Sequence, residues 1–129
     1  DKHIEIIKAV KDKLKWNGKI KGNVAMMPPK TMSKLQELYD NGVENPSFNI
    51  EVWPKSNFEK ICPGKQAHVG FDYVVDSLIY LRNIYGPGKV WSNFVAGIVP
   101  IEDMKNGFKN NKLICDLCKN CTFRKRFEK

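Results

Sequence analysis

Three cysteines near the C-terminus have the type and spacing of metal ligands. Cys115, Cys118 and Cys121 form a Cys-x-x-Cys-x-x-Cys sequence, the ferredoxin-like spacing that presents three thiolates to one iron-sulfur cubane. Basic residues around the motif would favour the thiolate form; they are Lys112, Lys119, Arg124 and Arg126. The motif predicts a [4Fe-4S] site. The alternatives are zinc with Cys62 as a fourth ligand, and thiols that bind no metal.

Two polar side chains in the first half of the chain could grip a ligand at the end of a strand. Asn49 and Glu51 alternate with the apolar residues Phe48, Ile50 and Val52. In an extended chain, this alternation places the amide and the carboxylate on one face. Such a pair suits two ribose hydroxyls, because the amide and the carboxylate both offer hydrogen bonds to them. The alternative is a polar pair that satisfies the backbone of a neighbouring loop.

A third segment, residues 92–102, carries a glycine near the end of an apolar run. Without a side chain, Gly97 would let a flat ring approach the backbone, whose amides and carbonyls can pair with adenine. Glu102 can begin the helix that follows. The alternative is that Gly97 serves only close packing.

Three segments in order, residues 48–53, 61–65 and 92–102, resemble the middle of radical S-adenosylmethionine (SAM) enzymes of the biotin-synthase-like group. The sequences are Phe48-Asn49-Ile50-Glu51-Val52-Trp53, Ile61-Cys62-Pro63-Gly64-Lys65 and Ser92 to Glu102. The resemblance covers about residues 19–108 and implies that Asn49 and Glu51 contact the SAM ribose.

The same resemblance assigns the adenine contact to the third segment. Val95 and Gly97 match two positions of the family's Gly-x-Ile-x-Gly-x-x-Glu pattern. Asn93 replaces the first glycine, and Pro100 stands where the family has its acid, so that the acid comes at Glu102. These departures imply that the adenine contact differs in part from the one that is usual in the family.

The family's Cys-x-x-x-Cys-x-x-Cys loop, which holds the [4Fe-4S] cluster that reduces SAM, has no counterpart in this sequence. The resemblance implies a parent enzyme that binds SAM and a [4Fe-4S] cluster and cleaves SAM reductively to a 5'-deoxyadenosyl radical. We therefore expect this chain alone to be inactive and its cysteine motif to be an auxiliary cluster site. A small-molecule substrate is implied, chosen by parts of the barrel that lie mostly outside this sequence.

The elements that must position these residues alternate along the chain. Helices are predicted over residues 3–16, from about 31 to Asn41-Gly42, over 71–84 and from 101 to 107; strands are predicted over 19–27, 47–53 and 89–99, with a helical turn and a loop over 54–69. This order is typical of right-handed β-α-β units. The predicted fold class is α/β: a partial (β/α) barrel with parallel strands over residues 1–108, followed by a basic, cysteine-rich tail over 109–129.

Length and charge limit the possible functions. A chain of 129 residues is too short for a complete (β/α) barrel, so we expect open sheet edges to be covered by the remaining barrel segment, a partner chain or a second copy in a homodimer. The net charge of +8 is concentrated at the two ends, while residues 23–108 are nearly neutral. This distribution does not favour nucleic-acid binding.

The remaining expectations concern environment and an alternative function. The sequence has no run of 18 apolar residues and no secretory signal. Clustered cysteines outside a secretory context indicate a reducing compartment, so we expect no membrane association and a cytoplasmic location. The alternative function is a small basic iron-sulfur or zinc module that touches RNA through its lysine-rich ends.

Overall fold

The computed structural model describes residues 2–18 and 20–110. Its elements, in chain order, are α1 (Lys2–Leu14), β1 (Ile20–Ala25), α2 (Ser33–Asp40), β2 (Val43–Ser47), α3 (Lys55–Ile61), α4 (Pro63–His68), α5 (Phe71–Tyr85) and α6 (Ile101–Asn110). The predicted tail motif, Cys115, Cys118 and Cys121, lies outside the described residues.

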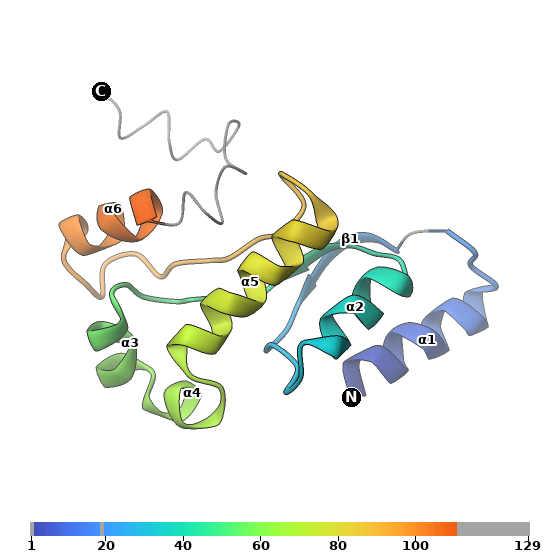
Figure 1. The fold of residues 1–129 in the computed structure, drawn as a ribbon, viewed down its shortest axis with the longest axis horizontal. Coiled ribbons are helices and arrows are strands. Elements are labelled where there is room, and N and C mark those ends of the chain that lie inside the picture. Colours follow the sequence, from blue (N-terminus) through green and yellow to red (C-terminus); the bar gives the residue numbers. More distant parts are fainter. Residues whose placement is uncertain (1, 19, 111–129) are drawn as a thin grey trace.

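The two strands are parallel and are joined by a helix, as the alternating sequence pattern predicts. β1 pairs with β2 through Val24 opposite Pro46 and Ala25 opposite Ser47, with an irregularity between Ile20 and Asn23. A third extended segment follows α5 and runs parallel to the chain at and just beyond β2, through isolated bridges from Ser47 to Trp91 and from Glu51 to Phe94. The three segments therefore lie side by side in chain order (Figure 1).

The strand boundaries differ from those predicted. The second strand is Val43–Ser47, earlier than the predicted 47–53, because pairing with β1 selects that stretch even though it contains Pro46. A proline lacks the backbone donor of a full ladder, but the Pro46 carbonyl still accepts a hydrogen bond from the Trp91 amide at 3.0 Å. The third predicted strand, 89–99, is reduced to the bridges at Trp91 and Phe94, since the chain turns at residues 96–97.

The hydrophobic core lies between the strands and the helices that follow them. α2 packs against both β2 and α5, and Figure 1 shows α2 and α5 as neighbours crossing in front of the strands. Leu35 and Leu38 of α2 are fully buried, as are three residues of α5 that helical periodicity predicts on its inner face: Val74, Leu78 and Leu81. The positive φ of 78° at Gly42 ends α2 as expected.

Helix α1 is less fully covered than its periodicity predicts. Ile4 and Ile7 are buried, whereas Ile6, Val10 and Leu14 are 60%, 44% and 64% exposed. These three residues recur every fourth position and so form a stripe along one side of α1. Its exposure means that only part of the apolar face of α1 is used by the described part of the chain.

Candidate functional site

The candidate ligand-binding segments, separated by some forty residues in sequence, lie against each other beyond the carboxyl end of β2. The amide of Phe48 donates to the Trp91 carbonyl at 3.1 Å, and the amide of Glu51 donates to the Asn93 carbonyl at 3.0 Å. The amide of Val95 returns a hydrogen bond to the Glu51 carbonyl at 2.7 Å. This edge of a parallel sheet is where ligands bind in α/β folds.

The side chains around Asn49 alternate between the core and the open side, as predicted. Phe48, Ile50 and Val52 are at most 1% exposed, whereas Asn49 and Glu51 are both half-buried. The Asn49 Oδ1 accepts hydrogen bonds from the Ser47 hydroxyl and from the Asn93 amide, each at 3.3 Å. Its amide nitrogen has no partner among the described residues, so it can donate to a ligand.

Glu51 has a backbone conformation that its residue type rarely adopts. Its φ is 70°, and the Val52 amide donates to the Ile50 carbonyl at 2.9 Å across it. This closes a three-residue γ-turn of the rare, strained kind with a positive central φ. The hydrogen bonds of the Glu51 amide and carbonyl to the third segment hold the turn in place.

Lys65, on α4, connects the two candidate ribose ligands. Its Nζ lies 3.0 Å from the Glu51 Oε1 and 2.5 Å from the Asn49 carbonyl oxygen, to which it donates. The side chains of Lys65 and Glu51 are only 14% and 28% exposed, so the pair is shielded from water more than a surface ion pair. The resemblance pointed to the Ile61–Lys65 segment, but nothing in the sequence indicated this contact.

Cys62 lies next to this ion pair. Burial raises the pKa of the Cys62 thiol above its usual value; the Glu51 carboxylate raises it further and the Lys65 ammonium opposes both effects. A raised pKa favours the neutral thiol. Among residues 2–18 and 20–110 there is no group of three His, Cys, Asp or Glu side chains that could hold a metal ion.

The predicted adenine-contacting residues lie on an open surface. Val95 is 44% exposed, and its amide is used by Glu51. Gly97 has a φ of 90°, and a Cβ added there would meet no atom of the described residues within 4 Å. Close packing therefore does not account for Gly97; the backbone turn does, because L-residues rarely adopt this φ.

Within the described residues, the side chain of Glu102 interacts with its own helix, α6, and not with the other candidate residues. It is exposed in the first turn of α6, and its carboxylate pairs with Lys105 at 2.6 Å. That hydrogen bond lowers the pKa of the Glu102 carboxyl below its usual value. The helix end and Lys105 therefore account for Glu102 within the described residues.

Ser92 and Asn93 are two further polar residues of this edge. The Ser92 hydroxyl accepts a hydrogen bond from the Ile50 amide at 3.0 Å, and Asn93 bonds through its backbone to both Asn49 and Glu51. In these bonds neither residue uses its own side chain to contact the side chain of Asn49 or Glu51. Their role is to align the two segments, which only the folded chain reveals.

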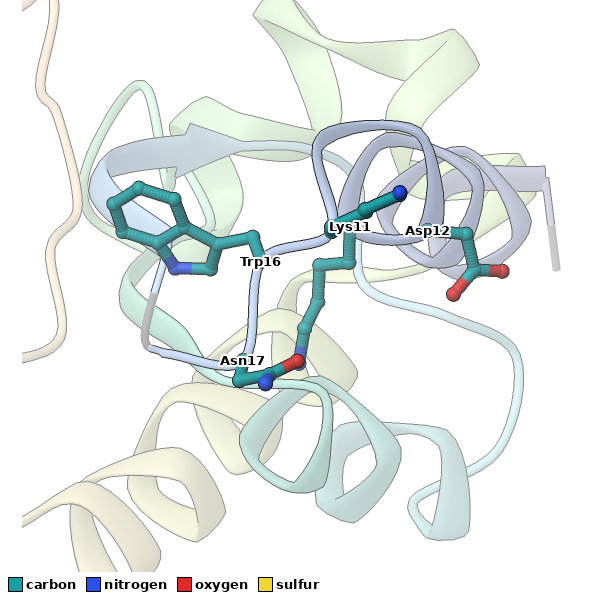
Figure 2. A pocket seen from close by; sticks show the side chains of 5 residues that line it. Lys11, Asp12, Trp16 and Asn17 are labelled. Carbon is teal, nitrogen blue, oxygen red and sulfur yellow. The ribbon is translucent and has the colours of Figure 1, made fainter.

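A shallow depression lies elsewhere, at the end of α1. It is lined by Lys11, Asp12, Lys15, Trp16 and Asn17, with Trp16 and Asn17 on the loop beyond the helix (Figure 2). This loop precedes β1, so the depression lies at the amino end of the strand, whereas Asn49 and Glu51 follow the carboxyl end of β2. It therefore adds nothing to the candidate ribose site.

In the described part of the chain, no helix is long and apolar enough to cross a membrane.

The chain is similar to a known protein over part of its length. No family model and no solved structure matches the chain. The chain is 28% identical over 83 residues to the bacteriochlorophyllide c C-7(1)-hydroxylase of Chlorobaculum limnaeum, a match that covers 64% of this chain and 21% of that protein. The chain thus spans about a fifth of the length of this relative. The likeness suggests the radical SAM family.

Proposed function

We propose that this chain is the SAM-binding part of a radical SAM iron-sulfur enzyme, with Asn49 and Glu51 as ligands of the SAM ribose. The observation that carries the proposal is the pairing of residues 48–51 with residues 91–95. This pairing brings the segment that the resemblance assigns to the ribose next to the one assigned to adenine. The similarity to a radical SAM hydroxylase supports the same family.

The donors and acceptors at this edge fit a nucleoside. The free Asn49 amide nitrogen can donate to one ribose oxygen, and the Glu51 carboxylate can accept from a ribose hydroxyl. Both side chains are half-buried, so their hydrogen bonds to a ligand would be only partly exposed to water. The open surface around Val95 and Gly97 leaves room for a flat ring against the backbone.

In radical SAM enzymes, a [4Fe-4S] cluster and SAM together supply a 5'-deoxyadenosyl radical on reduction. The described residues do not offer a ligand set for such a cluster. Their part is to bind and orient the nucleoside, so we expect this chain alone not to cleave SAM. Anaerobic incubation with SAM and dithionite, followed by chromatography for 5'-deoxyadenosine, tests this point.

The open sides of the fold support a larger assembly. Within the described residues β1 pairs only with β2, which leaves its other edge unpaired. α1, which precedes β1, also has its exposed stripe of Ile6, Val10 and Leu14. We propose that the remaining barrel segment, a partner chain or a second copy covers these surfaces. Light scattering at several protein concentrations distinguishes a homodimer from the other two.

Calorimetric titration of the purified chain tests ribose recognition. Adenosine should bind, and 2'-deoxyadenosine should bind about tenfold or more weakly. Glu51→Gln should weaken adenosine binding by a similar factor, since a hydrogen bond to a charged group contributes about 1.5–3 kcal/mol. Asn49→Ala removes a neutral hydrogen bond of about 0.5–1.5 kcal/mol and should weaken adenosine binding about two- to tenfold. Glu44→Gln is the matched control, because Glu44 lies on β2 and pairs with Lys89. Equal affinity for the two nucleosides would exclude ribose recognition.

The cysteine motif supports a second candidate, a small iron-sulfur or zinc module. Its spacing alone is a metal-binding pattern, independent of Asn49 and Glu51. Retained metal in a chain that binds neither adenosine nor SAM would favour this candidate over the first.

A further inference from the structure

Lys65 is a largely buried charged side chain that contacts both Asn49 and Glu51. Only 14% of its side chain is exposed, and its ammonium group makes two contacts with residues of the segment that follows β2. One contact is to the Glu51 carboxylate at 3.0 Å and the other to the Asn49 carbonyl at 2.5 Å. An ammonium has three donors, and these contacts use two of them.

The two contacts of Lys65 hold the two ends of the short segment 49–51. The Asn49 carbonyl precedes the γ-turn, and the Glu51 side chain projects from its central residue. A residue with a φ of 70° remains in that conformation only where its surroundings enforce it. The backbone hydrogen bonds from the third segment fix the turn, whereas among the described residues Lys65 alone pairs with the carboxylate.

The carboxylate of Glu51 is held at one oxygen. Its Oε1 pairs with Lys65, and among the described residues no other side chain donates a hydrogen bond to the carboxylate, although Cys62 lies nearby. Without Lys65 the side chain would be free to take other rotamers, and a ligand would have to immobilise it at an entropic cost. A carboxylate that is already oriented loses less entropy on binding.

We propose that Lys65 is a positioning residue that orients the Glu51 carboxylate for a ribose hydroxyl. This proposal rests on the proposed nucleoside-binding function and deepens it. It makes the affinity for adenosine, the uncharged part of SAM, depend on a lysine that does not touch the ligand. Lys65 acts through Glu51, so its removal weakens adenosine and SAM binding alike. A lysine that instead binds an anionic group of the ligand directly would affect SAM and leave adenosine unchanged.

The experiment measures the binding of adenosine and of SAM to the full chain by calorimetry. The variants are Lys65→Met, which keeps the apolar stem, and Lys65→Arg, which keeps the charge. Lys55→Met is the matched control, because Lys55 also pairs with an acidic residue, Asp72, but lies at the start of α3 with its side chain 45% exposed. Circular dichroism checks that each variant is folded.

We expect Lys65→Met to weaken adenosine and SAM by the same factor, about five- to tenfold, and Lys65→Arg to recover part of the loss. In a double-mutant cycle, adding Glu51→Gln to Lys65→Met should cause little further loss, because both changes remove one functional unit. The expected result for Lys55→Met is unchanged affinity for both ligands.

Two results would overturn the proposal while leaving nucleoside binding intact. The first is a loss for SAM alone, which would make Lys65 a direct ligand of the SAM carboxylate; the second is additive losses in the double-mutant cycle, which would mean that Lys65 and Glu51 act independently. If the unmodified chain bound neither adenosine nor SAM, the proposed function itself would be wrong, and the positioning role with it. If Lys65→Met did not fold, the affinities of Lys65→Arg and of the unmodified chain for adenosine and SAM would be compared instead. Equal losses for both ligands would support the positioning role, and a loss for SAM alone would overturn it.

Discussion

Replacing Glu51 by glycine should give a more stable protein than replacing it by alanine. Both changes remove the carboxylate and its contact with Lys65 equally, so the difference between them depends only on a Cβ at a φ of 70°. At this φ a Cβ costs about 1–3 kcal/mol. Glycine costs about 0.4–1 kcal/mol more than alanine in unfolded-state entropy. The net expectation is that Glu51→Gly exceeds Glu51→Ala in stability by about 1 kcal/mol.

The matched control is Glu44, which lies inside β2 and also pairs with a lysine, Lys89. Glu44 does not have a positive φ, so the order should reverse there: glycine should be less stable than alanine by about 0.5–1 kcal/mol. Urea unfolding followed by circular dichroism measures both differences. At position 51 the gap corresponds to about 4 °C in Tm for a domain of this size.

The opposite order at position 51, with alanine as stable as glycine or more so, would refute the strained turn. The inference that surrounding contacts hold Glu51 in an unusual conformation would then lose its basis. The orientation of the carboxylate by Lys65 would have to be argued from the ion pair alone.

Three further predictions concern other parts of the chain. Gly107→Ala should destabilise the protein by about 1–3 kcal/mol in urea unfolding, because its Cβ would lie 2.8 Å from the Trp53 Cβ. The control is Gly64→Ala, which should be neutral or stabilising, because Gly64 lies in a helix and its added Cβ would meet no atom of the described residues within 4 Å. Equal effects of the two changes would contradict the packing at Gly107. The Tyr85 hydroxyl is buried with no partner among the described residues, and burial raises the pKa of Tyr85. Tyr85→Phe should therefore stabilise the protein by about 1 kcal/mol. Above about pH 10 the unfolded tyrosine ionises before the folded one, so the unmodified protein loses stability as the pH rises, and Tyr85→Phe should lose less. Unfolding at pH 7 and pH 10.5 measures both effects, and an unchanged pH dependence would contradict the second. Anaerobically purified protein should contain about four irons per chain, lost when the tail motif is changed to alanine at Cys115, Cys118 and Cys121; one zinc, or no metal, would contradict the cluster.

Local patterns in the sequence predicted the elements and their inner faces. The spacing of Val74, Leu78 and Leu81 predicted α5 and its buried side, and the alternation of Phe48, Ile50 and Val52 predicted that Asn49 and Glu51 face away from the core. Such patterns are readable because the period of a helix or strand relates neighbouring residues in the sequence directly to directions in space. Strand boundaries were less readable, because pairing between β1 and β2 determined them.

The sequence by itself therefore determined which residues could form a ligand-binding edge, and the tertiary structure decided how that edge is built. The φ of 70° at Glu51 arises because its amide and carbonyl bond to a segment about forty residues further along the chain. The Lys65 contact arises because α4 lies against that turn. Neither interaction follows from a local period, since each depends on residues that only the folded chain brings together.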